Sequence, residues 1–461
     1  NPTRVSQIDA TQFGDGANSV AVNNGIVAVA IEGEAVGERG QVVFLDSDGN
    51  FLNSVEAGFL PDFVSFTPDG SKVLVANEGE PNEEFTVDPE GSVSIIDISG
   101  GVEDLTQDNV SEAGFTQFND QQEALEEDGV RIFGPDATVA QDLEPESVIA
   151  TPDSSTAYVT LQENNALAVV DLETSEVTDI FALGFKDHSL PENALDASDE
   201  DGINIQTIPS LGMLQPDAID VFEIDGENFI ITPNEGDARD FDGFSEEVGL
   251  DDLLEDELLD LDDDGEPDTL ETVTNATGET IEELLADDRL GELDFTSATG
   301  DNDDDGLIEQ LYNYGGRSFS IFDESGNLIF DSGDDFERIV AEQLPDNFNS
   351  DNDENDSFDS RSDAKGPEPE AVVTGEVNGD LFAFIGLERV GGIMVYNINN
   401  PSEPEFVEYV NNRNFEVEAE LEDGTTNPEV GDLGPEGLEF IPAEDSPNGE
   451  PLLAVGNEVS G

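Results

Sequence analysis

Residues 61–80 read PDFVSFTPDGSKVLVANEGE, two apolar runs joined by a turn sequence. Pro, Asp and Gly between runs rich in Val and Phe are typical of a β-hairpin. The unit begins with Pro and an acid and ends with Asn and Glu before a Gly. Segments that begin in the same way recur at Pro145, Pro216, Pro369 and Pro435. We therefore predict a chain built from repeated antiparallel strand pairs.

Further strands can be placed around these hairpins. Apolar runs follow four of them at the position of a third strand, at residues 91–98, 166–172, 317–323 and 392–398. Residues 18–58 contain four strands in a row, joined by tight turns. Such repeats are typical of β-propellers, so we predict an all-β protein in which residues 1–461 form one propeller domain. The repeats favour six blades, with seven as the alternative.

Two segments interrupt the repeat. Residues 103–140 contain NDQQEALEEDGVRIFG, which predicts a short helix in a packed excursion. Residues 240–313 form an acidic insertion with the helical pieces LLEDELL and TIEELLADDRL. The insertion falls between the second and third strands of blade four, and we interpret it as a lid or a small calcium-bearing subdomain. The last repeat stops at Gly461 after its second strand, so either a strand is missing or RVSQIDAT, residues 4–11, closes the ring.

The charge of the chain limits its partners. Its 461 residues include 112 Asp and Glu against 13 Lys and Arg, for a formal net charge of -99. Such a chain repels nucleic acid and anionic membranes and attracts cations. Hydrophobic residues make up 36% of the chain, and 45 Gly add to this share, so a large core is expected.

The residue types favour calcium over other metals. The chain has no Cys and one His, His188, so thiolate and imidazole ligands are nearly absent and oxygen ligands for hard cations remain. We expect His188, in FKDHSLP, to be a loop residue rather than a base. The chain has no apolar run of about 20 residues, and it opens without Met or a hydrophobic leader. Because calcium is abundant outside cells, we expect a soluble, secreted protein.

Acidic residues recur at the two ends of the predicted hairpins. In a propeller blade, the residue before the first strand and the residue after the second lie on the same face, near the central axis. The acids at these places are Asp62 and Glu78, Glu146 and Glu163, Asp217 and Glu235, Glu370 and Glu388, and Glu436 and Glu458. The first blade contributes Glu32 or Glu34. Carboxylates about 7 Å apart repel by roughly 2 kcal/mol, so we predict a shared metal site at one mouth of the propeller. The alternative is a set of solvated loop acids.

The insertion contains two sharper calcium motifs. Asp260, Asp262, Asp264, Gly265 and Glu271 fit the spacing of an EF-hand loop, in which a Glu at the twelfth position closes the coordination. A second run has acids at Asp301, Asp303, Asp305 and Glu309, with Tyr312 at the twelfth position. A third run, DNDENDSFD from Asp351, has Asp356 in place of Gly. The alternative for each is a hydrated acidic loop.

The few cationic residues lie in or beside the acidic motifs. They are Arg239, Arg317, Arg361, Lys365 and Arg389. In one reading they are internal counter-ions that orient carboxylates. In the other, Arg239, Arg317, Lys365 and Arg389 hold a phosphate or sulfate against bound calcium, as a metal-dependent phosphoesterase requires. Motifs of serine hydrolases, zincins and P-loop proteins are absent from the sequence.

Several segments resemble the choice-of-anchor I family. They are LDASDEDGINI, LQPDAI, PNEGDARD, YGGRSFSIFD, FDSRSDAKGPEPEAV and GPEGLEFIPAEDSPNGEPLLAVGNEVSG. That family includes mesenchyme-specific cell-surface glycoproteins associated with biomineralisation, and it is similar to phytase-like esterase propellers. The resemblance implies a secreted or surface-attached propeller, calcium association and, in some relatives, an alkaline-phosphatase label. The positions where a family site would fall are Asn234, Glu235, Asp237, Arg239, Arg317, Lys365, Glu368, Glu370, Glu436 and Glu458. This chain departs from the family in its heavier acid load and its stop after Gly461.

The sequence thus leaves two functions open. The first is a secreted calcium-binding propeller that acts in an extracellular matrix, at a mineral or in cell-surface adhesion. The second is a calcium-dependent phosphomonoesterase of the alkaline-phosphatase or phytase-like type. The expected partners are calcium ions together with a mineral, a polysaccharide or a phosphate ester, with no nucleic acid and no transmembrane segment. No residue can be assigned as catalytic.

Overall fold

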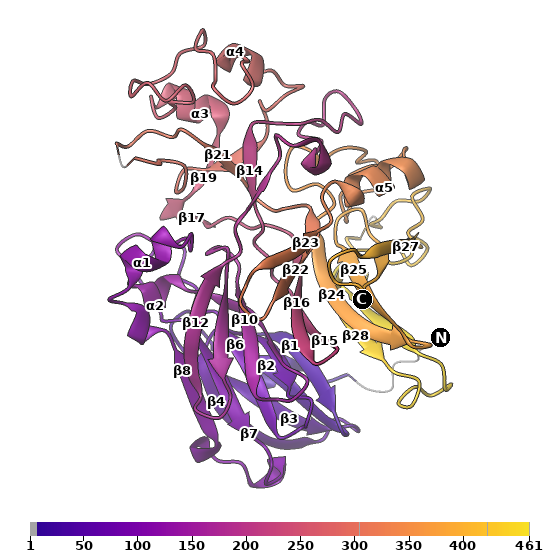
Figure 1. Cartoon of the computed structure of the whole chain (residues 1–461). Coiled ribbons are helices and arrows are strands. Elements are labelled where there is room, and N and C mark those ends of the chain that lie inside the picture. The colour runs from indigo at the N-terminus through magenta and orange to yellow at the C-terminus, as the bar shows by residue number, and fades with distance from the viewer. Residues whose placement is uncertain (1–6, 304, 422, 461) are drawn as a thin grey trace. The chain divides into compact units, whose positions relative to one another are not determined.

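The computed structural model describes residues 7–303, 305–421 and 423–460. Antiparallel β-sheets make up most of the ordered structure, and the helices are few and short (Figure 1). The predicted all-β class is therefore confirmed. No helix among these residues is both long and apolar enough to span a membrane. The α-helices are α1 (Gln122–Glu127), α2 (Val139–Asp142), α3 (Leu250–Glu255), α4 (Ile281–Leu284) and α5 (Asp335–Gln343).

The N-terminal part of the chain forms three four-stranded sheets, each made from consecutive strands. The first comprises β1 (Ala17–Asn23), β2 (Ile26–Ile31), β3 (Arg39–Asp46) and β4 (Phe51–Phe59). The second comprises β5 (Pro61–Phe66), β6 (Lys72–Asn77), β7 (Ser92–Asp97) and β8 (Val110–Gly114). The third comprises β9 (Pro145–Ala150), β10 (Thr156–Leu161), β11 (Ala166–Asp171) and β12 (Glu176–Ala182).

Later residues form three further antiparallel sheets, two with four strands and one with two strands among the described residues. One has the order β15 (Asp220–Ile224), β16 (Glu227–Asn234), β22 (Ser318–Asp323) and β23 (Leu328–Asp331). Another has the order β24 (Pro369–Val377), β25 (Asp380–Leu387), β26 (Ile393–Asn397) and β27 (Glu405–Val410). The last contains β28 (Pro435–Ile441) and β29 (Leu452–Asn457) among the described residues. The predicted third strands are thus β7, β11, β22 and β26.

The turns between first and second strands are held by an Asp side chain. In the second sheet, Asp69 accepts hydrogen bonds from the backbone N of Ser71 at 2.9 Å and from the hydroxyl of Thr67 at 2.8 Å. Gly70 has φ +67°, a conformation that residues with a Cβ rarely adopt. The turn in the third sheet repeats these Asp contacts, with Asp153 in place of Asp69. The sequence TPD thus fixes the first hairpin of the second and of the third sheet and its register.

A β-bulge recurs where a first strand begins. In β5, β9, β24 and β28, the pairing with the second strand shifts directly after the initial Pro, so the first strand carries one extra residue there. The acid after Pro lies in each bulge: Asp62, Glu146, Glu370 and Glu436. β1 has the same shift at Asn18. Because a bulge changes the direction of a side chain, it sets where these acids point.

The central strands of the sheets are buried on both faces. Every residue of β6 and β10 except the first is buried. A core cluster joins apolar residues of the first and second sheets, and another joins those of the second and third. Because neither face of these strands is exposed to solvent, their sequences are continuous apolar runs.

The insertion folds together with residues that precede it. A five-stranded sheet has the order β13 (Phe185–Asp187), β14 (Ser210–Met213), β21 (Leu311–Asn313), β20 (Asp294–Thr296) and β19 (Glu247–Gly249). In it, β14 and β21 are parallel. Apolar residues of α3 and α4 share a core with Leu195 and Ile208 (Figure 1). The sequence reading did not predict this sheet.

Two sequence expectations concern the ends of repeats. The excursion at 103–140 contains the predicted short helix, α1, and also β8, the fourth strand of the second sheet. Residues 4–6 of the segment proposed to close the ring lie outside the described residues. Ala10–Gln12, which overlap the end of the same segment, form a 3-10 helix, η1.

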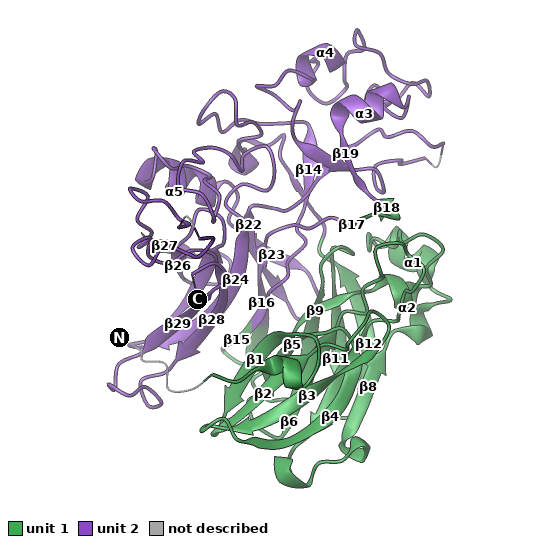
Figure 2. Ribbon diagram, turned by 180° about the vertical axis from the view of Figure 1, so that it is seen from behind, with its two compact units in different colours: residues 1–183, 221–228, 241–244 green, residues 184–220, 229–240, 245–461 purple. Residues whose placement is uncertain are grey.

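The contacts within the chain divide it into two compact units (Figure 2). Unit 1 comprises residues 1–183, 221–228 and 241–244. Unit 2 comprises residues 184–220, 229–240 and 245–461. The candidate sites below each lie within one unit.

Candidate functional site

A cluster of charged side chains surrounds Lys365 in unit 2. Lys365 Nζ donates to the backbone oxygen of Gly236 at 2.6 Å and lies 3.3 Å from Glu235 Oε1 and 3.5 Å from Glu368 Oε2. Glu235 directly follows β16, and the backbone of Gly315 packs against it. A Cβ on Gly315 would lie 1.9 Å from the Glu235 carbonyl oxygen, so only Gly fits there.

Glu368 is the centre of this cluster. It is fully buried, and Arg361 Nη2 lies 2.5 Å from one of its carboxylate oxygens while Arg389 Nε lies 2.9 Å from the other. Burial alone raises the pKa of Glu368, but the charges of Lys365, Arg361 and Arg389 outweigh it and lower the pKa to about 2. Glu368 is therefore an ionised carboxylate held by three cations.

Two neighbouring carboxyls behave in the opposite way. Burial raises the pKa of Glu388 to about 8, although Arg389 Nε lies 3.3 Å away and opposes the shift. Burial and the charges of Glu235, Asp217 and Glu388 raise the pKa of Glu370 well above its usual value. One oxygen from each of Glu235, Glu368 and Glu388 lies within 4.8 Å of the others, close enough to share one cation. In the metal-free protein, Glu388 therefore holds a proton at neutral pH, whereas Glu368 is ionised.

Each unit gathers part of the acid set predicted for the propeller mouth. In unit 2, Glu458 acts electrostatically on both Glu388 and Glu436. Asp237 lies 3.7 Å from Lys365 Nζ. In unit 1, burial raises the pKa of Glu78 well above its usual value, as do Glu80, Asp62, Glu163 and Glu144. Glu146 is buried in the β9 bulge.

Arg317 and Arg239 are buried rather than presented to solvent. Arg317 is 2% exposed and lies 2.6 Å from Glu337 Oε1. It also donates to the backbone oxygens of Asp196, Ser362 and Ala364. Arg239 is 2% exposed as well. These two side chains therefore act as internal cations, and we leave them out of a substrate-binding set.

His188 is also internal. Its Nδ1 lies 2.6 Å from the backbone oxygen of Asn193, and its Nε2 has no hydrogen-bond partner among the described residues. Burial and the charge of Lys186 lower the pKa of His188 to about 3. The imidazole is therefore neutral and is not placed to act as a base on a bound ligand.

The second acid-rich loop gathers its acids as the sequence reading grouped them. One oxygen from each of Asp301, Asp303, Asp305 and Glu309 lies within 4.8 Å of the others. Asp301 Oδ1 and Oδ2 accept from the backbone N of Asp305 at 3.1 Å and of Gly306 at 2.8 Å. Glu309 stands at the ninth position of this loop.

The first acid-rich loop has the same backbone geometry. Asp260 Oδ1 and Oδ2 accept from the backbone N of Asp264 at 3.0 Å and of Gly265 at 2.8 Å. The gathered acids are Asp260, Asp262 and Asp268, again with the ninth position closing the group. Glu271, the predicted twelfth-position ligand, is exposed and lies outside it. We call residues 260–268 and 301–309 the twin loops, since DLDDDGEPD and DNDDDGLIE share acids at the first, third, fourth, fifth and ninth positions and Gly at the sixth.

The twin loops are joined by backbone pairing. Leu259 and Ile308 form a parallel β-bridge, and Asp260 N donates to Ile308 O at 3.0 Å. A cavity of about 360 Å³ lies beside them, and its lining includes Asp263, Asn275 and Glu309. None of the gathered acids forms an ion pair with Lys or Arg in the part of the chain that the structure describes.

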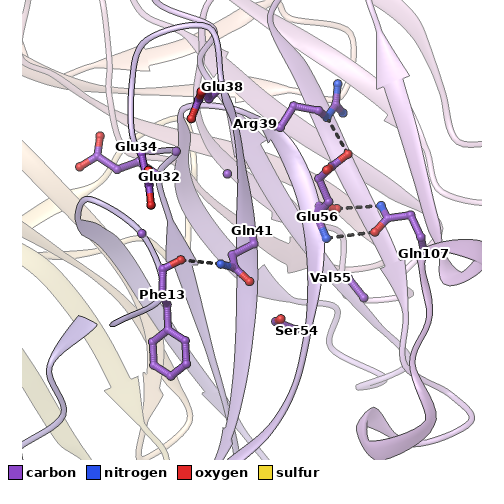
Figure 3. Close-up of a pocket in the computed structure, with 13 residues that line it drawn as sticks. Phe13, Glu32, Glu34, Glu38, Arg39, Gln41, Ser54, Val55, Glu56 and Gln107 are labelled. Atoms are coloured by element: carbon purple, nitrogen blue, oxygen red, sulfur yellow. Dashed lines mark hydrogen bonds and ion pairs between the residues drawn. The ribbon is translucent and has the colours of Figure 1, made fainter. Parts of the chain in front are cut away.

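A further cavity of about 350 Å³ lies beside the first sheet (Figure 3). Glu32 and Glu34, the mouth acids predicted for the first blade, line it together with Arg39. Arg39 pairs with Glu56 at 3.4 Å, and Gln107 exchanges two hydrogen bonds with the Glu56 backbone. Arg39, Glu56 and Gln107 thus pair with one another on this wall.

The family model of the choice-of-anchor I domain matches residues 1–401. The chain belongs to the choice-of-anchor I family. It is 31% identical over 186 residues to Gigasin-3a of Magallana gigas, which covers 39% of this chain and 65% of that protein. It is 28% identical over 296 residues to the mesenchyme-specific cell surface glycoprotein of Strongylocentrotus purpuratus, covering 57% of this chain and 35% of that protein. The chain thus spans less than two thirds of either relative.

Solved structures resemble this choice-of-anchor I chain only distantly. Hydrazine synthase of Kuenenia stuttgartiensis matches with a TM-score of 0.41 and 11% identity, covering 98% of this chain and 77% of that chain. These values are too low to establish a shared fold.

Arg361 holds Glu368, in agreement with the interpretation of the scarce cations as internal counter-ions. Two other residues of the site in this choice-of-anchor I chain were not predicted as ligands or partners. Asn352 donates to Glu388 Oε1 at 2.8 Å from within the third acidic run. Asp268 was not predicted, because the EF-hand spacing places the closing ligand at the twelfth position of the loop and Asp268 stands at the ninth. Aligning the two loops with each other would have found it.

Proposed function

We propose that this choice-of-anchor I chain is a calcium-binding β-propeller of six blades that acts outside the cell. Six sheets follow one another along the chain, and four of their first strands begin with the same bulged Pro-acid step. Within unit 1, β5 lies between β1 and β9, as first strands around a propeller axis do. Stacking of this kind supports the propeller.

The twin loops carry the calcium proposal. Each brings three or four carboxylates to within 4.8 Å by the same set of backbone hydrogen bonds. Bringing unpaired carboxylates together costs electrostatic energy unless a cation joins them. Carboxylate oxygens alone, without His or Cys, are the ligands that calcium prefers. The Asp260, Asp262, Asp268 group and the Asp301, Asp303, Asp305, Glu309 group each fit one ion.

Placement at a cell surface or in a matrix rests on the relatives and the charge. One relative is named a cell surface glycoprotein. A net charge of -99 suits a protein that meets calcium, a calcium mineral or a cationic polysaccharide. Calcium at extracellular concentrations saturates sites of even modest affinity.

Isothermal titration calorimetry of the metal-free protein with calcium chloride tests the calcium proposal. We expect saturable binding with at least one ion for each of the twin loops, and much weaker binding of magnesium, since Mg²⁺ gives up its water shell reluctantly. Asp260→Asn together with Asp301→Asn is expected to remove both loop sites. Failure of calcium to bind, or the same stoichiometry in this double variant, would refute the proposal.

A calcium-dependent phosphomonoesterase is the second candidate. Its supporting observation is that Arg389 lies 3.3 Å from Glu388, a carboxyl whose pKa is raised to about 8 and which therefore holds a proton for a leaving group. Lys365 contacts Glu368, which belongs to the same group of carboxyls. A chromogenic phosphate ester with calcium, with and without chelator, tests this candidate. Calcium-dependent turnover that Glu388→Gln abolishes would establish the enzyme. If the intact protein shows no turnover, the matrix-binding proposal stands alone.

A further inference from the structure

Three buried oxygen atoms of unit 2 lack a hydrogen-bond partner among the described residues. They are Asp196 Oδ1, Asn349 Oδ1 and Asp359 Oδ2, and all three residues are 0% exposed. Each atom can only accept, except when a carboxyl carries a proton. A buried acceptor without a partner is costly, so each of these oxygens indicates a missing hydrogen-bond donor or a missing cation.

The three residues belong to one hydrogen-bonded network. Asp196 N donates to Glu337 Oε2 at 2.8 Å, and Asn349 Nδ2 lies 3.2 Å from Glu337 Oε1. Ser362 connects the other two residues, because its hydroxyl accepts from Asn349 Nδ2 at 2.9 Å and donates to Asp359 Oδ1 at 2.7 Å. Glu337 comes from the buried face of α5. The donors of Ser362 and Asn349 are thus directed to other oxygens of the network, and the three acceptor oxygens stay without a partner among the described residues.

The network also lacks positive charge. It contains the carboxyl groups of Asp196, Glu337 and Asp359, whereas Arg317 is the cation that contacts it among the described residues, through Glu337 and the backbone oxygens of Asp196 and Ser362. Asp199 and Asp201 add further negative charge near Asp359. A water molecule would supply hydrogen bonds but no charge. A hard divalent cation supplies both a charge and a centre for oxygen ligands.

We propose that Asp196, Asn349 and Asp359 bind a calcium ion inside unit 2. The ion joins the loop after Leu195 to the segment that runs from Asn349 to Glu368. That segment carries Arg361 and Lys365, so the ion fixes the two cations that hold Glu368. This site is separate from the twin loops, and it stands or falls independently of them.

The test is the calcium stoichiometry of Asp359→Asn, measured by calorimetry and by elemental analysis after dialysis. We expect one ion fewer than in the parent, and one fewer again when Asp359→Asn is added to the variant that lacks both loop sites. Asp346→Asn, an exposed acid near the same segment, is the control and is expected to keep the parent stoichiometry. Unchanged stoichiometry in a folded Asp359→Asn variant overturns the proposal.

Diffraction from calcium-loaded crystals of the parent decides the matter if Asp359→Asn does not fold. We expect an anomalous peak within about 2.6 Å of Asp196 Oδ1, Asn349 Oδ1 and Asp359 Oδ2. A water molecule at that place, or a direct contact between a protonated carboxyl and its neighbour, overturns the proposal. Either outcome leaves the twin-loop sites to be judged by their own variants.

Discussion

Glu368 and Glu388 have the same side chain and are joined by a backbone hydrogen bond of 2.8 Å. At neutral pH, however, Glu368 is ionised and Glu388 is protonated. Both are buried, so burial alone does not distinguish them. Glu368 contacts Arg361, Lys365 and Arg389, and these charges lower its pKa to about 2. Glu388 shares only Arg389, and its pKa is raised to about 8. The number of cations in contact sets the charge of each carboxyl.

The raised pKa of Glu388 predicts a pH dependence of stability for the metal-free protein. Between about pH 4.5 and pH 8, the native carboxyl holds a proton that the unfolded chain releases, so stability falls as the pH rises through this window. Glu388→Gln is therefore expected to flatten the decline by up to about 1.4 kcal/mol per pH unit. Urea unfolding in chelator at several pH values measures this.

His188 opposes that trend at the lower end of the range. Because its native pKa is lowered to about 3, the unfolded chain binds the extra proton below about pH 6.5, and this group destabilises the fold as the pH falls.

Glu450→Gln, at an exposed position, is the control for the pH profile of Glu388→Gln. A parental pH profile in Glu388→Gln would contradict the assignment.

Lys365 predicts a large effect of a single substitution. Lys365→Met leaves the buried carboxylates of Glu235 and Glu368 without the cation they share. We therefore expect the free energy of unfolding to fall by about 3 kcal/mol or more. Urea unfolding in chelator measures the change. Lys72→Met, at the start of β6, is the control and should cost less than about 1 kcal/mol. Equal losses in the two variants would argue against a structural role for the Lys365 charge.

At the scale of elements, the ninth position of the twin loops supplies the carboxylate that completes each gathered group. In both loops the acid at the ninth position, Asp268 or Glu309, lies with the other gathered carboxylates. Asp268 is 7% exposed, and its Oδ1 has no hydrogen-bond partner among the described residues. The last ligand of each loop therefore stands at the ninth position, within the loop, and not at the twelfth position as in an EF-hand.

Two variants separate the ninth position from the twelfth. Asp268→Asn is expected to weaken or remove one calcium site, because it replaces a carboxylate of the gathered group with a neutral amide. Glu271→Gln is expected to leave the stoichiometry and affinity unchanged, because Glu271 is exposed and outside the group. Calorimetry with both variants checks this. The reverse result would support the EF-hand spacing instead.

The hairpins could be predicted from sequence, whereas the smaller sheet could not. Turn residues and apolar runs mark β5 and β6 because both strands are long and the second is buried on both faces. β13, β20 and β21 each contain three residues, too few for a periodic pattern. β8 buries only one of its residues, so its sequence does not look like a strand.

At the scale of the whole molecule, the sequence predicted which residues matter better than how each is used. Glu370 followed from the acids at the hairpin ends, Lys365 from the scarce cations and Glu368 from the family resemblance, and the structure places them together in unit 2. Arg317 came from the same resemblance but is buried, because it binds Glu337 and three backbone oxygens. Composition gives no sign of whether a cation faces inward or outward, since that depends on contacts between distant segments.

The central claim is that calcium neutralises carboxylates that the fold brings together, and thermal unfolding with and without chelator tests it most directly. Each site saturated about 100-fold above its Kd contributes about 2.7 kcal/mol. At physiological salt we therefore expect excess chelator to lower the midpoint by about 5 °C or more. Added calcium should restore the midpoint, and equimolar magnesium should not. The same midpoint with calcium and with chelator would contradict the account.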